Sequence, residues 1–225
     1  DTPAPAPKGD EVRIRVKAVG LNRAEADLRA GRMGPIDGLR VPGIEAVGEV
    51  LEDPSKTFRT GQRVATAMGG MQFTRNGSYA EEVTVLRSNV IDMDGTTLSW
   101  EELAALPQAY LTIWGALDRS LAIAPGQRIL IRGATSTVGL AAIAYAKRSG
   151  LHVIATSRSE KHAALLKETG AHTVLVDDGE IAAAVKQRYP EGLDAALEIV
   201  GAATLRDSAR TLRPFGALTV IGLLS

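Results

Sequence analysis

The first part of the chain shows apolar and polar residues in alternation, with a period of two. Four such segments lie between residues 11 and 92, at 11–21, 44–52, 62–68 and 79–86, and Gly, Pro and Asp residues separate them. This alternation with frequent turn residues predicts the strands of a compact β-rich unit. Between the first two segments, "NRAEADLRAG" has a helical pattern that ends at Gly31, and glycine is common where a helix ends.

The pattern changes near residue 99. Residues 99–123 have a helical period that is broken at Pro107, which predicts two helices meeting there, and Ser99 with Glu102 fits a capping box. Apolar strands and amphipathic helices then alternate. The strands are expected at 128–132, 152–157, 172–177, 194–200 and 217–224, and the helices at 137–149, 160–169, 179–188 and 202–212. This alternation predicts a doubly wound parallel sheet, and we place the two domains at 1–106 and 107–225.

Composition narrows the class of protein. The chain has 225 residues, of which 45% are hydrophobic, and its 26 basic and 26 acidic residues balance, which is typical of a soluble globular protein. Balanced charge argues against nucleic acid or a membrane surface as a partner. There is no cysteine, which excludes disulfides, a thiolate nucleophile and every cysteine-bearing zinc site. The proline-rich start lacks a signal-peptide core and no apolar run reaches membrane-spanning length, so we expect a cytoplasmic protein.

The stretch "ILIRGATSTVGLAAIAYAKRSG", residues 129–150, predicts a strand, a tight turn and a helix, the unit that holds a dinucleotide's pyrophosphate. Its G-x-G-x-x-G pattern is altered, since Ala134 and Ser136 occupy the first two glycine positions counted back from Gly139. Both replacements are small, and Gly133 keeps the strand end flexible. We therefore predict cofactor contacts from Gly133, Thr135, Ser136, Thr137, Val138 and Gly139. The alternative is that these residues only cap the helix.

The next predicted strand points to a particular cofactor. In dinucleotide folds an acidic residue about twenty positions beyond the loop binds the ribose 2′-hydroxyl of NAD. Here that region carries Ser157 and Arg158, with Lys161 nearby, and these side chains suit a phosphate. We therefore expect NADP(H) as the cofactor. The alternative is a solvated helix start whose Arg and Lys bind nothing.

Several motifs follow one another along the chain. They are "IRVKAVGLNRAEADLRAG", "PGIEAVGEV", "GQRVA", "GSYAEEV", "LPQAYLTIWGAL", "RGATSTVGLAA", "GLDAALEIVG" and "LRPFGALTVIGLL". In this order they resemble the medium-chain dehydrogenase/reductase superfamily, especially its zinc-independent quinone oxidoreductase-like branch. The resemblance implies a GroES-like β-rich catalytic domain followed by a doubly wound Rossmann domain, with both domains incomplete at the chain ends. It also implies an active site in the cleft between them.

The resemblance implies that catalysis proceeds without a metal. Zinc-dependent relatives need a cysteine near Asn22 and a histidine where this chain has Ile44. The three histidines, His152, His162 and His172, fall on three successive predicted elements, and we do not expect them to form a zinc site. Hydride transfer to a quinone or an α,β-unsaturated carbonyl compound needs less polarisation than alcohol oxidation does.

The resemblance also assigns roles to single residues. It implies that Asn22 places its amide in the cleft, that Thr112 meets the nicotinamide end of the cofactor, and that Tyr110 is a candidate acid. It places Val200 and Gly222, near the ends of later strands, at the cofactor. The structural alternatives are a helix N-cap for Asn22, an ordinary helix position for Thr112 and a core position for Tyr110.

The expected function is NADPH-dependent hydride transfer to a small quinone or enone, in a protein that forms a homodimer at full length. One departure from the family leaves the proton donor open: Met33 stands where relatives often have a tyrosine, and a thioether cannot donate a proton. Two alternatives remain. One is an NADPH-binding structural or regulatory protein without catalysis, and the other is an enoyl reductase module of a larger biosynthetic enzyme.

Overall fold

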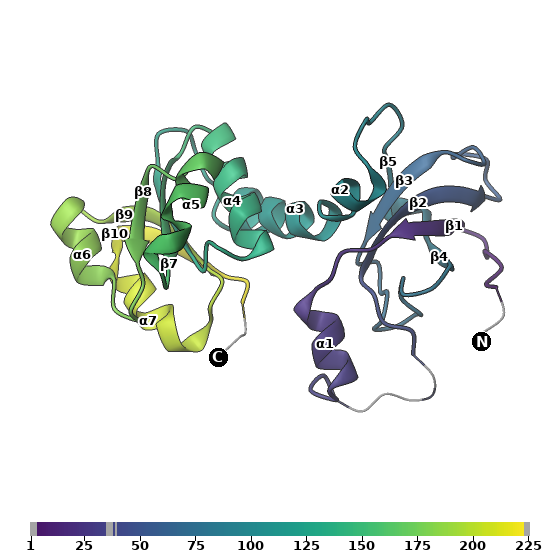
Figure 1. Cartoon of the computed structure of the whole chain (residues 1–225), viewed down its shortest axis with the longest axis horizontal. Coiled ribbons are helices and arrows are strands. Elements are labelled where there is room, and N and C mark those ends of the chain that lie inside the picture. The colour runs from purple at the N-terminus through teal and green to yellow at the C-terminus, as the bar shows by residue number, and fades with distance from the viewer. Residues whose placement is uncertain (1–3, 35–37, 39, 223–225) are drawn as a thin grey trace. The chain divides into compact units, whose positions relative to one another are not determined.

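The computed structural model describes residues 4–34, 38 and 40–222 (Figure 1). The chain divides into two compact units, Asp1–Gln108 and Ala109–Ser225. An antiparallel sheet forms in the first unit and a parallel sheet in the second, so the fold class predicted from the two kinds of alternation is confirmed.

The sheet of the first unit has the strand order β4-β1-β2-β3-β5. Its strands are β1 Glu11–Ala18, β2 Glu45–Glu52, β3 Arg63–Ala67, β4 Glu82–Leu86 and β5 Val90–Asp92. One face buries Val12, Ile14, Val50, Val64, Met71, Val83 and Val85. The other packs Val47 and Ala65 beneath Leu103 and Ala104. Strand β5 was not predicted, because three residues are too few to show a period.

Helices of this unit follow their predicted signals closely. Helix α1 spans Arg23–Arg29 and helix α2 spans Trp100–Ala104. The capping box is present, since Glu102 N donates to Ser99 Oγ at 3.2 Å and Ser99 N donates to Glu102 Oε2 at 2.8 Å. Helix α3 (Pro107–Trp114), most of which belongs to the second unit, begins at the proline, where a missing N–H costs nothing, so the predicted break is confirmed. A short 3-10 turn, η1, spans Arg87–Asn89.

The parallel sheet of the second unit has the order β10-β9-β6-β7-β8. Its strands are β6 Arg128–Arg132, β7 His152–Ser157, β8 Thr173–Val176, β9 Leu193–Glu198 and β10 Leu212–Val220. Its helices are the π-helix η2 Gly115–Ser120, which continues α3, then α4 Thr137–Arg148, the 3-10 turn η3 Glu160–His162, α5 Ala163–Thr169, α6 Ala182–Arg188 and α7 Ala202–Arg210. From β6 the chain first adds β7 and β8 on one side and then β9 and β10 on the other. The strands stay parallel, and the order of winding reverses at β6.

Strand residues of this sheet are buried on both faces. Ile129, Ile131, Val153 and Leu197 pack with residues of α3, α4 and α5, whereas Leu130, Ile154 and Ala196 pack with residues of α6. Both faces are therefore covered, as continuous apolar strands require. Each large aliphatic side chain buried here contributes on the order of 1.5–3 kcal/mol to folding.

The last strand differs from its prediction. Helix α7 ends at Arg210, before the predicted 212, and β10 already begins at Leu212, before the predicted 217. Residues 223 and 224 of the predicted strand lie outside the described residues. The pairing of β10 with β9 shifts between Leu212 and Ala217, where Pro214 lacks an N–H and Phe215 has a positive φ of 64°. A proline and an irregular pairing of this kind are tolerated at the edge of a sheet. Because Pro214 is not typical of a strand, the sequence pattern did not predict that β10 begins at Leu212.

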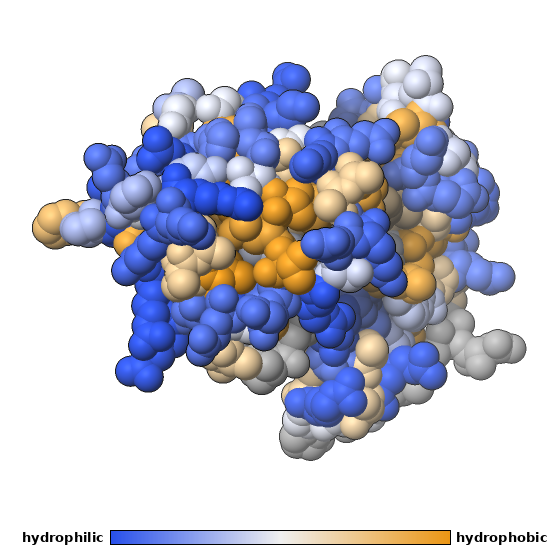
Figure 2. Space-filling view, turned by 60° about the vertical axis from the view of Figure 1, so that its left-hand side comes forward, coloured by the Kyte–Doolittle hydropathy of each residue, from blue (hydrophilic) through white to orange (hydrophobic). Residues whose placement is uncertain are grey.

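Surface composition is mixed. The face seen in Figure 2 is largely hydrophilic, with hydrophobic residues gathered in patches. Several apolar side chains are exposed, among them Leu111, Trp114 and Phe215. No helix within the described residues is long and apolar enough to cross a membrane.

Two histidines meet at the amino ends of adjacent parallel strands. The rings of His152 and His172 stack with centroids 4.4 Å apart, and His152 Nε2 lies 3.1 Å from the hydroxyl of Tyr189. Burial, together with His172 and Arg128, lowers the pKa of His152 below its usual 6.5. The unfolded chain therefore binds a proton at His152 at a higher pH than the folded chain does.

We predict that stability falls as the pH drops below the ordinary histidine pKa. On going from about pH 7.5 to about pH 5.5 the melting temperature is expected to decrease, because the unfolded state takes up more protons. His152→Gln is expected to make this decrease smaller, and the matched variant His162→Gln is expected to leave it unchanged. Thermal melting at both pH values measures this, and an unchanged pH dependence in His152→Gln would contradict the assignment.

Candidate functional site

Three backbone segments converge at the carboxyl ends of β6, β9 and β10. Gly133 follows β6 with a φ of 83°, and a Cβ there would lie 3.1 Å from the side chain of Ile199 and 3.3 Å from that of Val200. A Cβ on Gly222 would overlap the carbonyl group of Ile199. The structure thus brings Gly133, Val200 and Gly222 together, at the edge of a parallel sheet where ligands bind in such folds.

Ser136 closes the turn between β6 and α4. Its Oγ accepts from Gly139 N at 3.1 Å and donates to the carbonyl of Gly133 at 2.9 Å, so the hydroxyl serves as the N-cap of the helix. The capping role weighed from the sequence is therefore real. The amides of Thr137 and Val138 belong to the first turn, whose N–H groups have no acceptor within the helix. These two amides, rather than the Ser136 hydroxyl, are available for an anion.

Gly139 allows the helix to approach the strand end. A Cβ at this position would lie 2.6 Å from the carbonyl oxygen of Ala134 and 2.7 Å from its Cα. Ala134 itself is fully buried, so it has no room to move away. The one glycine of the altered pattern that the packing strictly needs has been kept.

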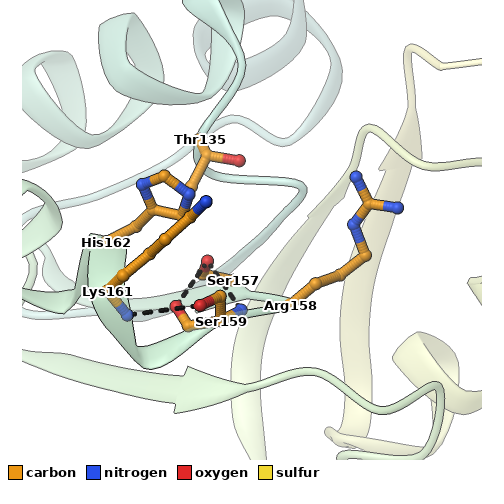
Figure 3. A pocket seen from close by; sticks show the side chains of 6 residues that line it. All are labelled: Thr135, Ser157, Arg158, Ser159, Lys161 and His162. Atoms are coloured by element: carbon orange, nitrogen blue, oxygen red, sulfur yellow. Dashed lines mark hydrogen bonds between the residues drawn. The ribbon is translucent and has the colours of Figure 1, made fainter.

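A polar cavity lies at the end of β7 (Figure 3). Its volume is about 290 Å³, and it is lined by Thr135, Ser157, Arg158, Ser159, Lys161 and His162. None of these six residues carries a carboxylate. In Figure 3 the side chains of Lys161 and His162 lie beside Thr135, and that of Arg158 extends away from them. The cavity is therefore basic, and it suits an anionic group.

Four lining residues match the sequence prediction and two were missed. The two missed residues, Ser159 and His162, lie within two positions of Lys161. Their nearness in the sequence to a predicted residue was the signal that could have identified them. The Ser157 hydroxyl is occupied, because it donates to the Ser159 carbonyl at 3.0 Å and accepts from Ser159 N at 3.3 Å. Ser157 shapes the turn, which leaves Arg158 and Lys161 as the charged groups.

Asn22, in the first unit, is held by two buried carboxylates. It is the N-cap residue of α1, its backbone N donates to Glu25 Oε2 at 2.9 Å, and its Nδ2 donates to Glu45 Oε1 at 2.8 Å. Glu45 Oε2 in turn accepts from Gln108 N at 2.9 Å. Burial raises the pKa of Glu45, although the bonds from Asn22 and Gln108 oppose this rise. Glu45 thereby orients the amide of Asn22.

The two candidates on α3 do not share a face. Tyr110 and Thr112 are two residues apart, and helix positions at that spacing point in different directions. The Tyr110 side chain is 38% exposed, so the alternative that it belongs to the core is wrong. Thr112 is half-buried.

Residues 8–98 match the family described as "Alcohol dehydrogenase GroES-like domain", and residues 137–225 match "Zinc-binding dehydrogenase". Mouse prostaglandin reductase-3 is 30% identical over 232 residues, which cover 100% of this chain and 58% of that protein. Pig quinone oxidoreductase is 31% identical over 231 residues, covering 99% of this chain and 67% of that protein. The structure of Escherichia coli quinone oxidoreductase complexed with NADPH superposes with a TM-score of 0.88 at 25% identity, covering 99% of this chain and 68% of that one.

A GroES-like antiparallel unit followed by a Rossmann unit defines a class of dehydrogenases and reductases. The chain belongs to the medium-chain dehydrogenase/reductase superfamily, in its quinone oxidoreductase-like branch, which confirms the resemblance seen in the sequence. It spans between 58% and about two thirds of the length of these relatives. Within the described residues, no group of three or more His, Cys, Asp or Glu side chains is arranged to hold a metal ion.

We predict that Gly139→Ala destabilises the protein by roughly 1–3 kcal/mol, because the added methyl group overlaps the backbone of Ala134. Gly115→Ala is the matched control: a Cβ at Gly115 meets nothing within 4 Å, so this helical Gly→Ala change is expected to leave stability unchanged or raise it by up to about 1 kcal/mol. Denaturant unfolding measures both. Equal stabilities of the two variants would mean that the helix can shift away from the strand.

Proposed function

We propose that this chain is part of an NADPH-dependent reductase that transfers hydride to quinones or α,β-unsaturated carbonyl compounds without zinc. The observation that carries the proposal is the cavity after β7, where Arg158 and Lys161 stand and no carboxylate does. An enzyme that selects NAD needs an acceptor here for the 2′-hydroxyl, whereas the 2′-phosphate of NADP needs donors and positive charge.

The pyrophosphate is proposed to lie over the turn after β6. Gly133 and Gly222 carry no side chain, which allows their backbones to lie close to the turn that contains Val200. Helix α4 points its amino end at the same turn, where its dipole and the Thr137 and Val138 amides favour a phosphate. With this sheet order, we propose that the adenosine half lies on the β7 side of β6 and the other half on the β9 side.

For the chemistry, bound NADPH supplies the hydride. An amide nitrogen carries two hydrogens, and Asn22 uses one of them for Glu45. We assign the second to the carbonyl oxygen of the substrate, where it stabilises the negative charge that develops on reduction. By family likeness, Thr112 orients the nicotinamide, and Tyr110 is the candidate donor of the proton. Support for a reaction without zinc comes from the sequence, which has no cysteine and carries Ile44 where zinc-dependent relatives have histidine.

We predict that Arg158→Ala weakens NADPH binding by roughly ten- to hundredfold, because a charge-assisted contact with the 2′-phosphate is lost. NADH lacks this phosphate, so its affinity is expected to change far less. Fluorescence titration of both cofactors against both proteins gives the comparison. Lys167→Ala, an exposed cation outside the cavity, is the control and is expected to bind both cofactors like the parent. An equal loss for NADH and NADPH in Arg158→Ala would show that Arg158 only supports the fold.

The activity is tested on the complete gene product, by following NADPH oxidation with a panel of quinones and enones. Turnover with one of these classes is expected. Tight NADPH binding without turnover of any acceptor would favour the alternative of a structural or regulatory protein. Turnover confined to acyl thioesters would favour an enoyl reductase module.

A further inference from the structure

A buried polar network lies directly beneath the proposed cofactor turns. Its centre is Arg132, the last residue of β6, which is fully buried. The guanidinium donates to both carboxylate oxygens of Asp177, at 2.8 and 2.7 Å, and to Asp207 Oδ2 at 2.8 Å. Burial opposes the charge of Arg132, but the bonds to Asp177 and Asp207 raise its pKa above the ordinary value. The guanidinium therefore stays charged and fixed in position.

One arm of the network reaches the turn after β9. Arg132 Nη1 donates to Ser208 Oγ at 3.1 Å, and Ser208 Oγ donates to Glu198 Oε2 at 2.5 Å. The other oxygen of Glu198 accepts from the backbone N–H groups of Val200 and Gly201, at 2.8 and 3.1 Å. Gly201 has φ 130° and ψ −150°, a conformation that is essentially restricted to glycine. The carboxylate of Glu198 thus stabilises the Val200–Gly201 turn through two hydrogen bonds to its backbone.

The other arm reaches the turn after β6. Thr156 Oγ1 donates to Asp177 Oδ2 at 3.1 Å and accepts from Gly133 N at 3.4 Å. The turn after β6, which we assign to the pyrophosphate, and the Val200–Gly201 turn after β9 are therefore joined to a single guanidinium. Buried ion pairs add little net stability compared with apolar residues of similar size, so stability alone does not account for this network.

Resting on the proposed function, we infer that Ser208 and Glu198 are positioning residues for the half of NADPH that lies beyond the pyrophosphate. The cavity for the 2′-phosphate is on the β7 side of β6, and the Val200–Gly201 turn is on the β9 side. Neither residue touches the cofactor. Both act through the backbone of this turn, and so they affect one half of the dinucleotide.

Ser208→Ala tests this inference, with NADPH and adenosine 2′,5′-bisphosphate as the two ligands. The bisphosphate carries the 2′-phosphate but lacks the half of NADPH beyond the pyrophosphate. Loss of the Ser208 hydroxyl is expected to weaken NADPH roughly tenfold, because the Glu198 carboxylate loses a donor and the turn loosens. Binding of the bisphosphate is expected to change by less than about twofold, because the cavity after β7 is untouched.

Glu198→Gln is the conservative companion variant. Its side-chain carbonyl still accepts from the Val200 and Gly201 amides, so NADPH binding is expected to stay within about threefold of the parent. An equal loss of both ligands in Ser208→Ala would show general damage to the fold and would overturn the inference. Unchanged binding of both ligands would overturn it as well. If the unaltered protein binds neither ligand, the proposed function fails, and that outcome is visible before any variant is compared.

Discussion

A charged guanidinium at the centre of a parallel sheet has to find all its partners inside the protein, because leaving it unpaired costs far more than a lost hydrogen bond. Arg132 meets this requirement with Asp177 after β8 and with Asp207 and Ser208 on α7. One side chain therefore connects the end of the central strand to the end of β8 and to helix α7. Through Thr156 and Glu198, these bonds also fix the backbone turns that follow β6 and β9.

The altered glycine pattern is understood in the same physical terms. A pyrophosphate loop needs backbone clearance, tight packing of helix on strand and free amides at the start of the helix. Gly133 and Gly139 meet the first two needs. Ser136 caps the helix through its hydroxyl and leaves the next two amides free. Glycine is dispensable at the positions of Ala134 and Ser136, because the Ala134 side chain is buried and the Ser136 hydroxyl is bonded within the turn.

Much of the architecture could be predicted from the sequence, because local signals and tertiary packing agree. Period-two strands, the break at Pro107 and the capping box at Ser99 all follow from near neighbours in the chain. Strand β5 and the irregular β10 could not be predicted, since one is too short and the other contains Pro214.

Some residues of the site could be predicted from the sequence, and others could not. Arg158 and Lys161 stand within one turn of the expected strand end, so spacing alone could locate them. The roles of Arg132 and Glu45 could not be predicted. Arg132 finds Asp177 and Asp207 at 45 and 75 positions along the chain, and Glu45 finds Asn22 at 23 positions. Such contacts exist only once the sheets are assembled.

We propose above all that the turns at the strand ends around Arg132 form an NADPH site, with the 2′-phosphate after β7. A crystal structure of the protein with NADPH tests it most directly. We expect phosphate density within hydrogen-bond distance of Arg158 or Lys161, and pyrophosphate density over the amides of Thr137 and Val138. A nucleotide whose 2′-phosphate points away from this cavity, or whose pyrophosphate lies elsewhere on the sheet, would contradict it.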